Sequence, residues 1–152
     1  MFRGSIMLLS GTAFLLAALA GETGIKAEFV GGTLPGVAPR TTARLGLTDP
    51  EIFRVSAGKN EVEIPYRRID TLEYGQHVSR RYAEAVLLSP IFLLSKSRKH
   101  FVTIGYEDGS GQHQAVVFRV EKGDIRGVLA SLETRSGRKV VYQDDEARKA
   151  GQ

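Results

Sequence analysis

Apolar and polar residues alternate along most of the chain between residues 28 and 120, and no other feature constrains the fold as strongly. Successive side chains of a β-strand point to opposite faces, so alternation with period two predicts strands with one buried face. Proline and glycine interrupt the alternation and mark turns. The pattern predicts strands at residues 28–33, 42–47, 52–57, 61–64, 67–74, 101–107 and 112–120.

Two turns and one helix complete the predicted elements. Gly58-Lys59-Asn60 and residues 108–111 (Asp-Gly-Ser-Gly) are typical of hairpins, because Gly and Asp tolerate the positive φ of tight turns. Asp124 is a suitable N-cap, and Gly137 suits the position after the last helical turn. The apolar residues between them have helical spacing: Ile125, Val128, Leu129 and Leu132. A short last strand is expected at residues 139–142, and a frayed polar tail at 144–152.

The first twenty residues have the features of an export signal. Arg3 gives a positive start, residues 6–20 carry no charge, and Ala18-Leu19-Ala20 is a small-x-small cleavage pattern. The apolar run is shorter than the roughly 20 residues of a spanning helix. We expect residues 1–20 to be a signal peptide or a retained membrane anchor, with a core helix as the alternative. The domain would then cover residues 21–143, exported to the periplasm or outside the cell, or anchored to the membrane.

The composition restricts the class of protein. Of 152 residues, 42% are hydrophobic and 25% are charged, which is typical of a globular domain. The chain contains no cysteine, so disulfides and cysteine-based zinc sites are excluded. The net charge of +4 is distributed among interleaved acids and bases, which does not indicate a nucleic-acid partner.

The predicted order is about seven short strands followed by one amphipathic helix. This order resembles the bacterial pleckstrin-homology-like (PH-like, GRAM-like) domains, as do the segments 68–75 (Arg-Ile-Asp-Thr-Leu-Glu-Tyr-Gly) and 100–106 (His-Phe-Val-Thr-Ile-Gly-Tyr). The resemblance implies a mainly β fold, a bent sheet or partly open barrel capped by one C-terminal helix. It also implies binding of lipid headgroups, peptides or proteins without chemistry. Phosphoinositide-binding members have several basic residues between the first two strands, whereas residues 34–41 contain Arg40 alone.

Residues 76–99 form an insertion between the fifth and sixth predicted strands. A largely apolar run at residues 83–94 is flanked by basic residues and is too short to span a bilayer. One interpretation is a helical insertion that contacts a membrane surface, since flanking cations attract anionic headgroups. Packing of the run against the domain and a homo-oligomer or other protein interface are the alternatives. The candidate contact residues are Arg80, Arg81, Leu87, Leu88, Phe92, Leu93, Lys96, Arg98 and Lys99.

The sequence contains no recognisable catalytic motif. The histidines are His77, His100 and His113, and none has zinc-binding helical spacing. No Gly-x-Ser-x-Gly motif is present, and Ser110 near His113 lacks an orienting acid of known position. We therefore expect no enzyme, metal or cofactor, but a binding module of the cell envelope that contacts a membrane surface or a protein partner. A carrier of a small apolar ligand in a barrel cavity and a small metal-dependent or hydrolytic enzyme are the alternatives.

Overall fold

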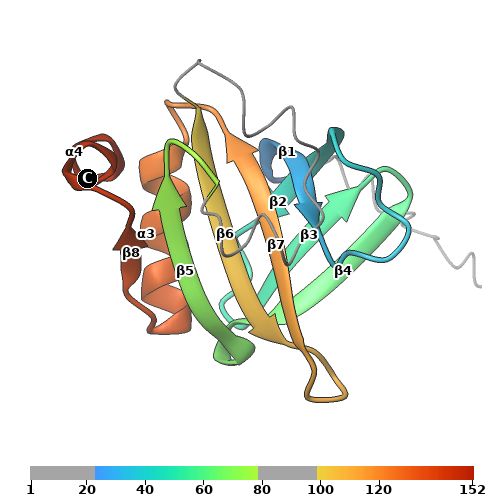
Figure 1. Cartoon of the computed structure of the whole chain (residues 1–152). Helices are drawn as coiled ribbons and strands as arrows, with labels where there is room; N and C mark the ends of the chain where they lie inside the picture. Colours follow the sequence, from blue (N-terminus) through green and yellow to red (C-terminus); the bar gives the residue numbers. More distant parts are fainter. Residues whose placement is uncertain (1–22, 79–98) are drawn as a thin grey trace, which may run out of the picture.

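The computed structural model describes residues 23–78 and 99–152, and β-strands dominate them (Figure 1). A single mixed sheet of eight strands has the order β4-β3-β2-β1-β7-β6-β5-β8. The elements in chain order are β1 (Ile25–Gly32), β2 (Thr41–Gly46), β3 (Ile52–Ala57), β4 (Asn60–Pro65), the 3₁₀ helix η1 (Tyr66–Arg68), β5 (Ile69–Gly75), β6 (His100–Glu107), β7 (His113–Val120), α3 (Ile125–Ser136), β8 (Val140–Tyr142) and α4 (Asp145–Gly151).

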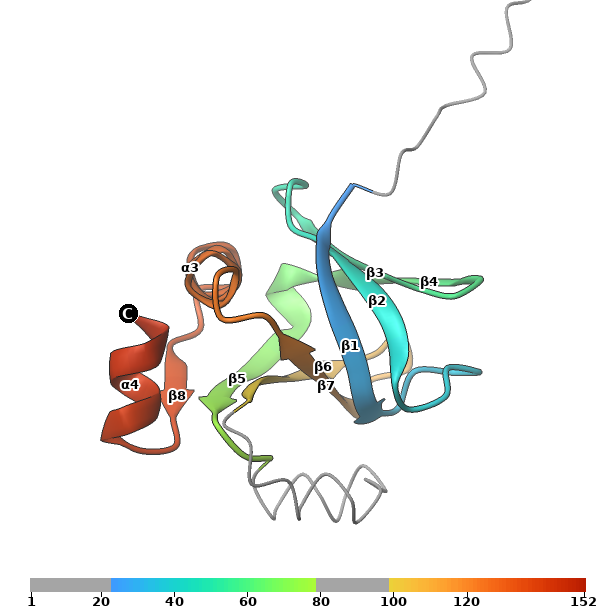
Figure 2. The ribbon, with the colours of Figure 1, turned by 90° about the horizontal axis from the view of Figure 1, so that it is seen from above.

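The strands are antiparallel neighbours except for β8, which pairs with β5 in parallel. Strands β4 and β8 form the two edges, so the sheet is not closed into a barrel. Figure 2 shows α3, β8 and α4 together at one side of the molecule, with β2, β3 and β4 at the other side. Strand β1 connects the two halves of the sheet, because it pairs with β2 along one edge and with β7 along the other.

The main hydrophobic core lies between the inner face of the sheet and α3. Alternate residues of the strands supply it, as the period-two pattern predicts. Four residues of α3 close it: Ile125, Val128, Leu129 and Leu132. The largest fully buried side chains are Tyr66, Tyr74, Phe29, Phe53, Phe118, Leu45, Ile64, Ile69, Leu72, Ile104, Ile125 and Leu129.

The predicted C-terminal helix is confirmed. Helix α3 begins after Asp124 and ends at Gly137, whose left-handed φ of 70° is the conformation that glycine adopts without strain. Asp124 occupies the N-cap position, but its side chain forms no capping hydrogen bond. The strands predicted at residues 52–57, 101–107 and 139–142 correspond to β3, β6 and β8.

The structure corrects three details of the sequence-based interpretation. Two helices rather than one follow β7, and the short strand expected after the first helix joins the seven predicted strands as the edge strand β8 of one eight-stranded sheet. Arg67 and Arg68 belong to η1 and not to the following strand. Residues 144–152 are not a frayed tail. Asp144 caps α4 by accepting a hydrogen bond from the Ala147 amide at 2.7 Å, and Ala147 is buried against the core.

Residues 1–20, the predicted signal peptide or anchor, lie outside the described residues, as does most of the predicted insertion, residues 79–98. Within residues 23–78 and 99–152, neither α3 nor α4 is long and apolar enough to cross a membrane.

Candidate functional site

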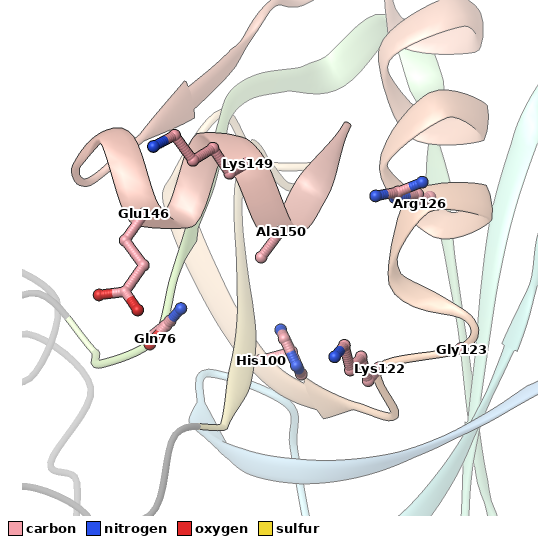
Figure 3. Close-up of a pocket in the computed structure, with 8 residues that line it drawn as sticks. All are labelled: Gln76, His100, Lys122, Gly123, Arg126, Glu146, Lys149 and Ala150. Atoms are coloured by element: carbon pink, nitrogen blue, oxygen red, sulfur yellow. The ribbon is translucent and has the colours of Figure 1, made fainter.

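A surface cleft of about 850 Å³ lies where α4, the start of α3 and the ends of β5, β6 and β7 come together (Figure 3). Four separate parts of the chain contribute to it, and α4 supplies one side. The lining residues are Gln76, His100, Lys122, Gly123, Arg126, Glu146, Lys149 and Ala150.

Positive charge predominates in the lining of this cleft. Lys122, Arg126 and Lys149 are cationic, and Glu146 is the one acid among the eight lining residues. With His100 neutral, the lining therefore carries two positive charges in excess. A concave surface that concentrates one sign of charge raises the local concentration of the opposite ion. The cleft is thus suited to an anionic ligand.

Arg126 occupies a position that the helix itself disfavours. It lies in the first turn of α3, and that turn contains no acidic residue. The helix dipole places partial positive charge at this end, so an acid there would be more stable than a cation. Helix α4 has the favourable arrangement, with Asp145 and Glu146 in its first turn and Lys149 in its last. The helix dipole therefore does not favour Arg126 at this position, although the acidic N-cap residue Asp124 lies two residues before it.

His100 contributes a ring nitrogen to the cleft in a fixed orientation. Its Nδ1 is hydrogen-bonded to the Tyr74 hydroxyl. The two rings stack with an interplanar angle of 4° and centroids 6.0 Å apart, and Tyr142 packs edge-on against Tyr74. Burial lowers the pKa of His100, and the positive charge of Lys122 lowers it further, while Glu121 acts in the opposite direction. His100 is therefore kept predominantly neutral near pH 7.

Gln143 ties the end of β5 to the segment that carries α4. Its side-chain amide donates to Glu73 at 3.1 Å and to the His77 carbonyl at 2.8 Å, and its backbone amide donates to the Tyr74 carbonyl. A side chain at Gly75 would displace the Gln143 side chain from this position, because a Cβ there would lie 1.7 Å from the Gln143 Oε1. These contacts hold Gln76, at the mouth of the cleft, close to α4.

Of the contact residues predicted from the sequence, Lys99 lies in the described part of the chain, is half-buried and directly precedes β6. The others, Arg80, Arg81, Leu87, Leu88, Phe92, Leu93, Lys96 and Arg98, lie outside it. The described residues on either side of this stretch belong to a second apolar cluster. Val78 and Phe101 are buried together with Val30 and Val117. Alternation along β6 and β7 places this cluster on the face of the sheet opposite the main core.

The groups considered for catalysis do not converge in the described structure. The Ser110 hydroxyl donates to Asp108 at 2.7 Å, and the His113 ring is paired with Asp70 at 3.1 Å. Two acids that alternate along β4, Glu61 and Glu63, both pair with Arg54 instead of facing a histidine or serine. No group of three or more His, Asp or Glu residues within residues 23–78 and 99–152 is arranged to hold a metal ion.

Two further clefts lie in the described part of the chain. One lies beside Lys26, Glu28, Arg119 and Glu121, and the other beside Arg44, Asp49, Arg54 and Glu61. Charged and hydroxyl side chains predominate in both linings. Neither cleft has the apolar lining that a carrier of small apolar ligands requires.

No protein-family model matches this chain, and no curated protein matches it. Sequence reasoning did not identify Gln76, Lys122, Arg126 or Lys149. The available signal was Arg126, a cation two residues after the N-cap of a predicted helix, in the first turn where acids are preferred.

Proposed function

We propose that this protein is a non-catalytic binding module of the cell envelope that contacts an anionic membrane surface. The observation that carries the proposal is the location of the basic cleft. Gln76 and His100 line it, and they lie just before and just after residues 79–98 in the sequence. The cleft is therefore close to both points where the predicted membrane-contacting insertion joins the sheet.

The charges of the two regions have the same sign. The cleft has an excess of two positive charges, and the insertion contributes Arg80, Arg81, Lys96 and Arg98 from the sequence. Each Lys or Arg near an anionic leaflet contributes about 1 kcal/mol to membrane association. Together with the apolar residues Leu87, Leu88, Phe92 and Leu93, this is the combination that monotopic membrane contacts use. A signal peptide or anchor at residues 1–20 would bring the domain to the envelope.

The fold is proposed to be PH-like. Seven antiparallel strands followed by α3 support this assignment, as does the pairing of β1 with both β2 and β7. Strand β8 and α4 are additions to the resemblance drawn from the sequence. Because α4 supplies one side of the cleft, these additions are part of the proposed binding surface.

A protein partner or a second copy of the chain remains the alternative ligand. An apolar run such as residues 83–94 requires burial against some surface, and a protein surface would also serve. The two ligands differ in their dependence on lipid. Membrane binding requires anionic lipid and weakens with salt, whereas an apolar protein interface is largely insensitive to both.

Vesicle co-sedimentation tests the proposal. The full chain is expected to sediment with vesicles that contain phosphatidylglycerol and to remain in solution with pure phosphatidylcholine. Reversal of two charges in the double variant Arg80→Glu, Arg81→Glu is expected to reduce the vesicle affinity at least tenfold, given about 1 kcal/mol for each lost cation. The matched control is Lys59→Glu in the exposed β3–β4 turn, which should bind like the wild type. Equal binding by the double variant and the wild type would overturn the electrostatic basis of the proposal.

A further inference from the structure

The basic cleft has chemistry that selects among anions. We propose that it binds a phosphate group carried by an organic molecule, with Arg126, Lys122 and His100 as the groups that contact the phosphate. This inference deepens the proposed binding function, on which it rests, by naming the class of ligand and the residues that recognise it.

The charge of the lining favours a doubly charged anion. Three cations and one carboxylate leave two positive charges uncompensated when His100 is neutral. A carboxylate ligand would neutralise one of them, whereas a phosphate monoester carries between one and two negative charges near pH 7. The guanidinium of Arg126 adds geometric preference, because its planar pair of N–H donors matches two phosphate oxygens.

The three groups line the same cleft. Figure 3 shows the His100 and Lys122 side chains next to each other at the base of the view, with Arg126 above them on α3. The charge of Lys122 reaches the His100 ring, since it contributes to the lowered pKa of that residue. When Tyr74 donates its hydroxyl proton to Nδ1 of His100, the proton of the neutral ring lies on Nε2 and is available to an anion.

Arg126 is the residue whose placement this ligand explains. In the first turn of α3 a cation opposes the helix dipole, and a bound phosphate would lie against both the cation and the positive end of that dipole. Lys149, by contrast, lies in the last turn of α4, where a cation stabilises the helix without any ligand. Functional positions are commonly the ones that fold stability alone would not select.

The cleft has room for a molecule larger than a phosphate ion. Its volume of about 850 Å³ is within the range of sites for organic ligands and far exceeds that of one phosphate ion. Gln76 and Glu146 offer additional polar groups, and Ala150 offers an apolar contact. A phosphorylated lipid headgroup and a soluble phosphate ester share this chemistry, and the experiment below distinguishes them.

The test is a titration of the ¹⁵N-labelled full chain with inorganic phosphate, followed by amide chemical shifts at constant ionic strength. Saturable shifts are expected at Gly123, His100 and Ala150, with chloride producing none. Sulfate should bind as well, because it is also a small dianion. Arg126→Gln is expected to weaken phosphate binding about tenfold, as expected for loss of a charge-assisted pair. The matched control is Arg67→Gln in η1, which packs near the opposite end of α3 and should bind phosphate like the wild type.

His100→Gln provides a second variant that does not depend on the stability of α3, and it is expected to weaken phosphate binding severalfold. Phosphate shifts that do not saturate, or that are the same in wild type, Arg126→Gln and His100→Gln, would overturn the inference. Vesicles of phosphatidate test for a phosphorylated lipid headgroup, and glycerol 3-phosphate tests for a soluble phosphate ester. Tighter binding to either than to inorganic phosphate supports the inference and identifies the source.

Failure of this inference is distinguishable from failure of the proposed function. Vesicle binding that is insensitive to Arg126→Gln, together with the absence of saturable phosphate binding, leaves a membrane-contacting module without a phosphate site. Saturable phosphate binding without any sedimentation on anionic vesicles leaves a phosphate site in a protein that does not contact membranes.

Discussion

Replacement of Arg126 by glutamate is predicted to make the protein more stable. Arg126 is exposed in the first turn of α3, where the helix dipole disfavours a cation and favours an anion. Each effect is worth about 0.3–1 kcal/mol at an exposed helix terminus, so the reversal from one charge to the other should add about 1 kcal/mol. Lys122, four residues earlier, becomes an attractive neighbour, whereas the N-cap residue Asp124 becomes a repulsive one, so these two neighbour effects oppose each other. For a domain of this size, the gain corresponds to an increase in Tm of about 3–5 °C.

Thermal unfolding followed by circular dichroism at low salt measures this change. Arg126→Gln removes the cation without adding an anion and should give about half of the increase in Tm. High salt should reduce both effects, because exposed charges are screened. The opposite variant is Lys149→Glu in the last turn of α4, where the same reasoning predicts a lower Tm. A Tm of Arg126→Glu at or below that of the wild type would refute the reasoning, because it would show that Arg126 stabilises the fold.

Two further predictions concern burial and pH. Phe101 is 3% exposed on the face of the sheet opposite the main core, so Phe101→Ala should lower the free energy of unfolding by about 3–5 kcal/mol in denaturant titrations. The control is Val141→Ala, at a position 58% exposed, which should change the free energy of unfolding by less than about 0.5 kcal/mol. Because the pKa of His100 is lowered in the folded state, the unfolded chain binds more protons below its ordinary pKa of 6.5. The contribution of His100 to the free energy of unfolding should therefore be fully present above pH 6.5 and be lost as the pH drops through the folded pKa. The variant His100→Gln should flatten this pH dependence. An unchanged pH profile of stability in His100→Gln would contradict the prediction.

The strands and α3 were predictable because their signals are local. Alternation identified β3 to the residue, and Gly137 marked the end of α3 because a left-handed residue there requires glycine. Helix α4 was missed because its stability comes from capping and charge rather than from an apolar stripe. Asp144, the acids after it and the basic residues at 148–149 were visible in the sequence, but low hydrophobicity favoured a frayed tail.

The cleft was less predictable than the fold. Its residues come from four parts of the chain, and no periodic pattern indicates that His100, Lys122 and Lys149 line one cleft. Their meeting depends on β8 pairing in parallel with β5, which brings α4 beside the ends of β5 and β6. Parallel pairing of a three-residue strand leaves little trace in a sequence, since it requires no turn motif and no long alternation.

The position of β1 has a consequence for how the chain folds. Strands β2, β3 and β4 pair with their sequence neighbours, but β1 also pairs with β7, and the Glu28–Arg119 contact between them joins residues 91 positions apart. Closure of such a long loop costs chain entropy before the free energy of strand pairing offsets that cost. Folding should therefore be slow for a domain of this length, on the scale of milliseconds to seconds that is typical of non-local β topologies. Until β7 arrives, one edge of β1 remains open to pairing with another chain, so the first half of the sheet is the part of the nascent protein most in need of protection from aggregation.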